Sequence, residues 1–89
     1  MQAFMNHFAS PSFWFKYRTL PADVQLLADK NFALLKADSS HPSLRLKKVG
    51  DFWSARVGLR YRALARECKL GLIWFWIGNH KDYEALLNP

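Results

Sequence analysis

The sequence predicts a single α+β domain in which an N-terminal helical hairpin packs on a twisted antiparallel sheet of about four strands. Residues 1–89 suffice for one compact domain, and no Pro-, Gly- or Ser-rich linker or internal repeat divides them. Apolar residues recur at helical spacing up to about residue 38. From residue 44 the pattern changes to short strand-like runs joined by two-residue links, which favour antiparallel pairing.

The N-terminal half contains the predicted helices. Residues 2–8 form a short mixed segment, interpreted as an edge strand. Ser10 followed by Pro11 is typical of an N-cap and a first helical residue, so a short helix should follow. Pro21 restarts the chain, and a second helix is predicted to end near Asp38. Its apolar positions hold to one stripe, formed by Val24, Leu27, Ala28, Phe32 and Leu35.

The predicted strands follow a turn at residues 39–43. They span residues 45–49, 52–57, 60–67 and 70–77. The last strand is apolar on both faces, so it belongs at the sheet centre or beneath a helix. The middle strands carry several arginines and need one face in water. The helical hairpin should therefore cover the other face.

Positive charge is concentrated in residues 44–66. This segment holds seven Lys and Arg residues against one acid, whereas residues 1–43 hold four basic and three acidic residues. Such a local excess of cations leaves several without an acidic partner, which favours a binding surface for phosphate. The seven basic residues are Arg45, Lys47, Lys48, Arg56, Arg60, Arg62 and Arg66.

Composition excludes several other classes of protein. The single Cys68 rules out an internal disulfide and a Cys-based zinc cluster, and the three histidines have no zinc spacing, so no metal or cofactor is expected. The longest apolar run, residues 70–77, is too short to span a bilayer, so a cytoplasmic protein without membrane contact is expected. Aromatic residues, 16% of the chain, exceed what so small a core can hide, which indicates a partner or self-association. The predicted core includes Trp53, Trp74 and Trp76.

The chain resembles the RelE/ParE superfamily of bacterial toxin–antitoxin modules over nearly its whole length. After the helical hairpin, the likeness is carried by HPSLRLKKV, FWSARVGLRYRALARE and WFWIGNHKDYEALL. The resemblance implies a small basic toxin that is neutralised by a cognate antitoxin wrapped around its sheet. RelE-type members enter the ribosomal A site and cut mRNA, whereas ParE-type members poison DNA gyrase, and the fold alone does not choose between these activities.

For a RelE-like toxin, the resemblance implies an mRNA endoribonuclease that works without a metal. Such cleavage needs a base for the 2′-OH, cations for the phosphate and an acid for the leaving 5′ oxygen. Arg62 would clamp the phosphate together with Arg56, His80 would transfer a proton, and Tyr83 would share a helix face with His80 and stack on a base or donate to phosphate. Further RNA-binding cations would be Arg45, Lys47, Lys48, Arg60, Arg66 and Lys81.

The chain departs from RelE where RelE has two lysines two residues apart. Ser54 and Arg56 stand at these positions, so one expected cation is missing. If His80 is the base, the acid comes from elsewhere, such as Lys47 or the ribosome; if His80 is the acid, no strong base candidate remains. Three functions therefore stay open: a ribosome-dependent mRNA endoribonuclease that inhibits translation, which the residues favour, a ParE-like gyrase inhibitor, and a degenerate member that binds RNA or protein without cleaving.

Overall fold

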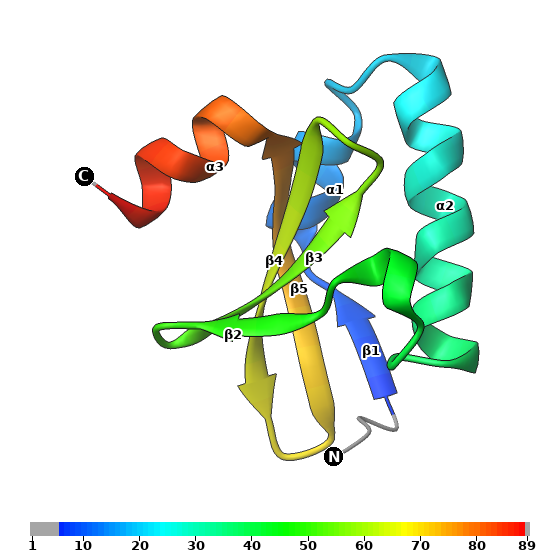
Figure 1. The fold of residues 1–89 in the computed structure, drawn as a ribbon, viewed down its shortest axis with the longest axis vertical. Coiled ribbons are helices and arrows are strands. Elements are labelled where there is room, and N and C mark those ends of the chain that lie inside the picture. The colour runs from blue at the N-terminus through cyan, green and yellow to red at the C-terminus, as the bar shows by residue number, and fades with distance from the viewer. Residues whose placement is uncertain (1–5, 89) are drawn as a thin grey trace.

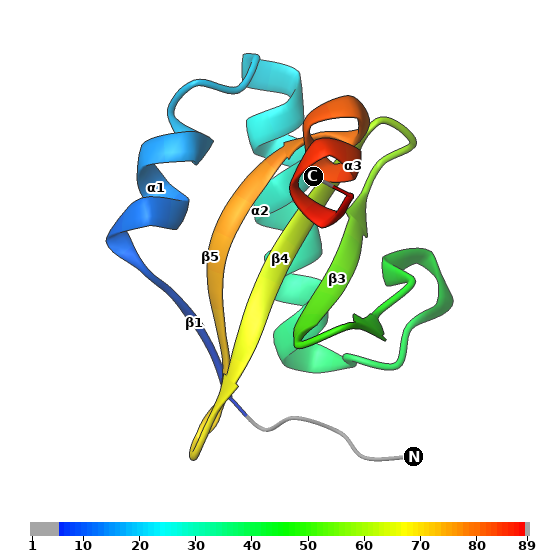
Figure 2. The same cartoon turned by 90° about the vertical axis from the view of Figure 1, so that its left-hand side faces the viewer.

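The structure, a computed structural model, describes residues 6–88 and forms one five-stranded sheet with three α-helices (Figure 1). The strand order is β1-β5-β4-β3-β2. Side chains of α1 and α2 pack on one face of the sheet, and α3 projects from the other (Figure 2). The predicted α+β class and helical hairpin are confirmed. In chain order the elements are β1 (Asn6–Ala9), α1 (Pro11–Tyr17), α2 (Ala22–Ala37), the 3₁₀ turn η1 (Pro42–Leu44), β2 (Lys47–Val49), β3 (Phe52–Val57), β4 (Tyr61–Cys68), β5 (Gly71–Asn79) and α3 (His80–Leu87).

The first two helices begin where the local sequence predicts. The Ser10 hydroxyl accepts a hydrogen bond from the Phe13 backbone N–H at 3.4 Å, and Pro11 is the first helical residue. Asp23 lies in the first turn of α2, where a negative charge is favoured by the helix dipole. The predicted stripe of α2 meets the sheet, with three of its members buried and two partly buried: Val24, Ala28 and Leu35, then Leu27 and Phe32.

The sheet has five strands rather than about four because the N-terminal strand pairs with the last one. β1 runs parallel to β5, with His7 opposite Leu72, so β5 becomes an interior strand. The edge strand predicted over residues 2–8 is found at Asn6–Ala9, and residues 2–5 lie outside the described part of the chain. The other four strands form the expected antiparallel meander.

β3 has its predicted boundaries, whereas those of β2, β4 and β5 shift by one or two residues. β2 begins at Lys47 rather than at residue 45, because Arg45 ends η1 in the left-handed conformation, with φ of 48°. Leu44, just before it, is fully buried and ties η1 to the core. β5 continues two residues beyond its predicted end, to Asn79, and leads directly into α3.

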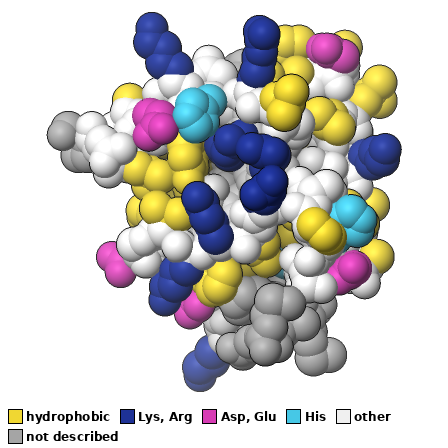
Figure 3. Space-filling view, viewed as in Figure 1, with side chains coloured by type: hydrophobic (Ala, Val, Ile, Leu, Met, Phe, Trp, Pro, Cys, Tyr) yellow, Lys and Arg dark blue, Asp and Glu magenta, His cyan; other side chains and the backbone are white. Residues whose placement is uncertain are grey.

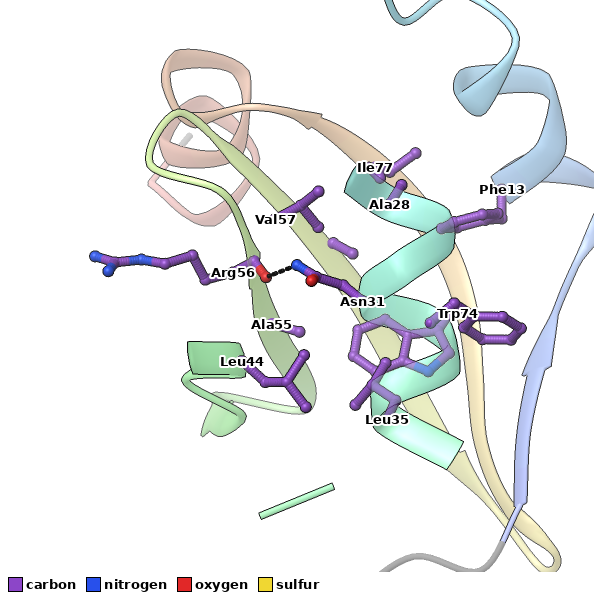
Figure 4. Close-up of a pocket in the computed structure, with 12 residues that line it drawn as sticks. Phe13, Ala28, Asn31, Leu35, Leu44, Ala55, Arg56, Val57, Trp74 and Ile77 are labelled. Carbon is purple, nitrogen blue, oxygen red and sulfur yellow. Dashed lines mark hydrogen bonds between the residues drawn. The ribbon is translucent and has the colours of Figure 1, made fainter. Parts of the chain in front are cut away.

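The core lies between the helical hairpin and the sheet, around Trp74, which is only 1% exposed (Figure 4). A cavity of about 20 Å³ remains there, close to the space that one water molecule needs. Trp53 packs against the same core, as predicted, and its indole N–H donates to the Glu67 carboxylate at 2.9 Å. Trp76 differs from the prediction because it is half-buried on the opposite sheet face, where its indole occupies the space above Gly78.

His7 fastens β1 to the core. Its Nδ1 accepts a hydrogen bond from the Trp74 indole N–H at 3.1 Å, so in the neutral ring Nε2 carries the proton. That Nε2 is buried and has no hydrogen-bond partner among the residues that the structure describes. Burial, and secondarily the charge of Lys36, lowers the pKa of His7 below its usual 6.5.

We expect the free energy of unfolding to fall as the pH drops below about 6.5. The folded pKa lies below the unfolded one, so in this range the unfolded chain binds a proton that the folded chain excludes, and stability is lost. Urea unfolding between pH 8 and pH 5 measures the decline. A His7→Gln variant keeps a side-chain acceptor but does not titrate, so its decline should be smaller. Equal declines in both proteins would contradict this account.

Candidate functional site

The sheet face opposite α1 and α2, here called the open face, carries a group of basic side chains. Cross-strand pairing places Lys47 beside Ser54 and Arg56 beside Arg62, all on this face, because the alternate residues of β3 and β4 point into the core. Figure 3 shows basic side chains gathered in the middle of this view of the molecule. Like charges directly opposite each other destabilise a strand pair, so the arginine pair is unfavourable for the stability of the sheet.

Each of the two arginines makes a hydrogen bond, through the backbone of Arg56 and through the guanidinium of Arg62. The backbone carbonyl of Arg56 accepts a hydrogen bond from the Asn31 side chain at 3.1 Å, while its guanidinium points away from the core (Figure 4). Arg62 donates from Nη1 to the Tyr61 carbonyl at 2.9 Å, which uses one of its five N–H donors. Within residues 6–88, neither arginine forms an ion pair with a carboxylate. This arrangement suits an anion with several oxygens, such as phosphate.

An open cleft of about 630 Å³ lies between α3 and the β2–β3 hairpin. Four of the predicted site residues line it and come from three different elements: Lys47 from β2, Arg62 from β4, and His80 and Tyr83 from α3. The cleft therefore brings cations and an imidazole to one place on the open face. The rest of its lining comes from the hairpin and the end of the chain: Val49, Gly50, Asp51, Phe52, Glu84, Leu86, Leu87 and Asn88.

One local and one long-range hydrogen bond fix the position of α3. Asn79 caps the helix, with its side-chain oxygen accepting from the Asp82 backbone N–H at 2.8 Å. The backbone N–H of His80 donates to the Arg60 carbonyl at 2.7 Å, which ties the helix start to the β3–β4 turn. Tyr83 is 7% exposed, because α3 packs against β4 and β5 at this point. The direction in which His80 faces is thus set by the sheet.

The His80 side chain is 49% exposed and has two neighbours. Its ring stacks on that of Tyr83, with centroids 5.9 Å apart and an interplanar angle of 29°. Its Nε2 lies 3.1 Å from Oε1 of Glu84, four residues later on the helix. Tyr83 therefore supports the imidazole and leaves little ring surface for stacking on a base.

Six of the ten predicted site residues do not line the cleft. Arg56 stays on the open face beside Arg62, whereas Lys48 pairs with Trp53 and so faces away from Lys47. The remaining four are exposed and lie in the loop after η1, in the β3–β4 turn, toward the far end of β4 and on α3: Arg45, Arg60, Arg66 and Lys81.

The residue that sequence reasoning missed is Glu84. The spacing of four residues from His80 is the signal that could have found it, because such residues are neighbours on a helix surface. Among the described residues, no group of three or more His, Cys, Asp or Glu side chains is placed to hold a metal ion. In the same part of the chain, no helix has the length and apolar character needed to cross a bilayer.

Comparison with known proteins adds a family and a fold. A family model described as the ParE-like toxin domain matches residues 23–85, which run from the start of α2 into α3. The structure is similar to a chain of the RelB–RelE antitoxin–toxin complex from Methanococcus jannaschii, with a TM-score of 0.72 and 15% identity over 92% of this chain and 99% of that one. No curated protein matches the sequence.

Proposed function

Because the chain belongs to the ParE-like toxin domains of the RelE/ParE superfamily, we propose that it is the toxin of a type II toxin–antitoxin module and acts as a ribosome-dependent mRNA endoribonuclease. The observation that supports nuclease activity is the cleft, where Lys47, Arg62 and His80 meet. Phosphate-binding cations beside a group that transfers protons are what metal-free RNA cleavage requires. No cofactor is needed for this chemistry.

The proposed reaction is attack of the ribose 2′ oxygen on the neighbouring phosphorus. His80 takes the 2′ proton, the new O–P bond closes a 2′,3′-cyclic phosphate, and the bond from phosphorus to the 5′ oxygen breaks. Arg62 stabilises the charge that develops on the phosphate oxygens, with Arg56 beside it. The leaving 5′ oxygen takes a proton from Lys47 or from a ribosomal group.

Lys47 can compensate for the cation that the chain lacks at position 54. Ser54 is 2% exposed and lies directly opposite Lys47 on the neighbouring strand. Side chains opposite each other on an antiparallel pair are close enough for one to cover the space of the other. Lys47 lines the cleft and lies next to the position where a longer basic side chain at residue 54 would stand, so it supplies a cation to the same region. This placement supports an active toxin rather than a degenerate one.

We also propose a cognate antitoxin as the protein partner. The similar solved structure is of an antitoxin–toxin complex. This chain exposes large apolar side chains on β1 and α1, namely Phe8, Trp14 and Phe15, which are 41%, 38% and 66% exposed. Apolar groups of this size on a small protein are typical of an interface. Self-association through the same side chains is the competing use of this surface.

Induced expression in a bacterial host tests the proposed function. We expect growth arrest, loss of translation and new mRNA 5′ ends in register with the reading frame, because cleavage would take place in the ribosomal A site. The uninduced culture is the control. Gyrase inhibition is the second candidate, since the matching family is described as ParE-like, and it would give arrest with intact mRNA and damaged DNA. No arrest would favour a member that binds without cleaving.

A further inference from the structure

The side chains of His80 and Glu84 contact each other inside the cleft, with a defined ring nitrogen of His80 facing the Glu84 carboxylate. Nε2 of His80 lies 3.1 Å from Oε1 of Glu84, and both residues line the same cleft as Arg62. An ionised carboxylate only accepts hydrogen bonds, so the contact places a hydrogen on Nε2. Among the described residues, Nδ1 of His80 has no hydrogen-bond partner. In the neutral imidazole, Nδ1 therefore carries the free lone pair.

We propose that Glu84 is a positioning residue that holds His80 in its Nε2–H tautomer and so leaves Nδ1 as the atom that accepts the 2′-OH proton. This inference rests on the proposed nuclease function and assigns His80 the role of base. A carboxylate bonded to one ring nitrogen also stabilises the imidazolium that forms when the other nitrogen takes a proton. The Tyr83 ring, stacked at 5.9 Å, restrains the same imidazole from its face.

The negative charge of Glu84 allows a positioning role to be distinguished from a purely electrostatic one, because the two roles predict opposite changes in cleavage rate when Glu84 is removed. An acid beside Arg62 and Lys47 opposes the binding of a phosphate chain, so a purely electrostatic role predicts tighter RNA binding and faster cleavage once Glu84 is removed. A positioning role predicts the reverse for the rate: kcat falls while KM stays the same or improves. Both side chains are about half exposed, and an exposed pair of this kind adds little to folding, so the variants should fold.

The first measurement is nitrogen NMR of the His80 ring at pH 8, above the usual titration range of histidine. We expect wild type to show the proton on Nε2 alone, Glu84→Ala to show a mixture of tautomers, and Glu84→Gln, which keeps an acceptor oxygen, to restore the wild-type pattern. Asp82→Ala is the matched control, since it removes an acid from the same helix without touching His80. A proton on Nδ1 in wild type, or no change in Glu84→Ala, would overturn the proposal.

The second measurement is the cleavage rate on programmed ribosomes. We expect Glu84→Ala to lower kcat by roughly tenfold, the lower end of the losses seen when the hydrogen-bond partner of a metal-binding histidine is removed, with most of the rate restored in Glu84→Gln. A rate that rises in Glu84→Ala would overturn the positioning role. If wild type does not cleave at all, the nuclease proposal fails and the role of base fails with it. If wild type cleaves mRNA but the His80 tautomer is the same in Glu84→Ala as in wild type, the positioning role of Glu84 fails and the nuclease proposal stands.

Discussion

Replacing Arg62 with alanine is expected to slow mRNA cleavage by about 10²–10³-fold, the loss typical of removing one donor that stabilises charge in a transition state. Arg62 lies in the cleft wall, forms no ion pair among the described residues, and has most of its N–H donors available. Among the described residues, no other arginine lines the cleft, and Arg56 lies outside its lining, opposite Arg62 on the neighbouring strand. The cleavage rate on ribosomes carrying a defined mRNA measures the effect.

Two further variants separate a phosphate clamp from general positive charge. Arg18→Ala removes an exposed arginine at the end of α1, on the part of the chain that does not reach the cleft, and should cleave at the wild-type rate. Arg62→Lys keeps the charge but loses the forked donor geometry, so its rate should fall between those of wild type and Arg62→Ala. Equal losses in the Arg18 and Arg62 variants would show that only net charge matters.

Stability gives an independent control on the Arg62 variant. Arg56 and Arg62 are directly opposite each other on β3 and β4, and like charges in that position repel. Removing one of them should leave the free energy of unfolding unchanged or raise it slightly. A large loss of stability in Arg62→Ala would instead mean that reduced cleavage reflects a damaged sheet.

Features encoded by neighbouring residues could be predicted from the sequence. The Ser10–Pro11 helix start, the apolar stripe of α2 and the short links of two or three residues in the meander are each encoded by residues close together in the sequence. The parallel pairing of β1 with β5 could not be predicted in this way, because it joins residues more than sixty positions apart. His7 lies on the edge strand, as expected, but this pairing buries its side chain, which accepts a hydrogen bond from Trp74.

The candidate site was predictable only where it depends on residues close together in the sequence. Strand alternation placed Arg62 on the face opposite Tyr61, and that face is the open one. The pairing of Lys47 with Ser54 follows from the Gly50–Asp51 turn. That Lys47 stands next to the position of the missing cation becomes evident only once the register of the two strands is known. The direction of α3 depends on the buried Tyr83 and on a backbone hydrogen bond to the β3–β4 turn, which no sequence pattern specifies.

Replacing His80 with alanine is expected to lower cleavage by about 10²–10⁴-fold, the usual contribution of a positioned acid or base. RNA binding should change little, because the cations of the open face remain. The backbone N–H that ties α3 to the Arg60 carbonyl also remains, so α3 should keep its place. Cleavage rate and RNA affinity, measured on the same preparation, test both parts.

The same variant separates the two candidate toxins inside cells. A nuclease that loses its proton-transfer group should no longer arrest growth, whereas a gyrase inhibitor acts by binding and should tolerate the loss of one imidazole. His41→Ala is the matched control, since His41 is an exposed histidine at the start of η1 and does not line the cleft. Arrest by His80→Ala as strong as that by wild type, with mRNA left intact, would assign the toxicity to a surface other than the cleft and favour gyrase as the target.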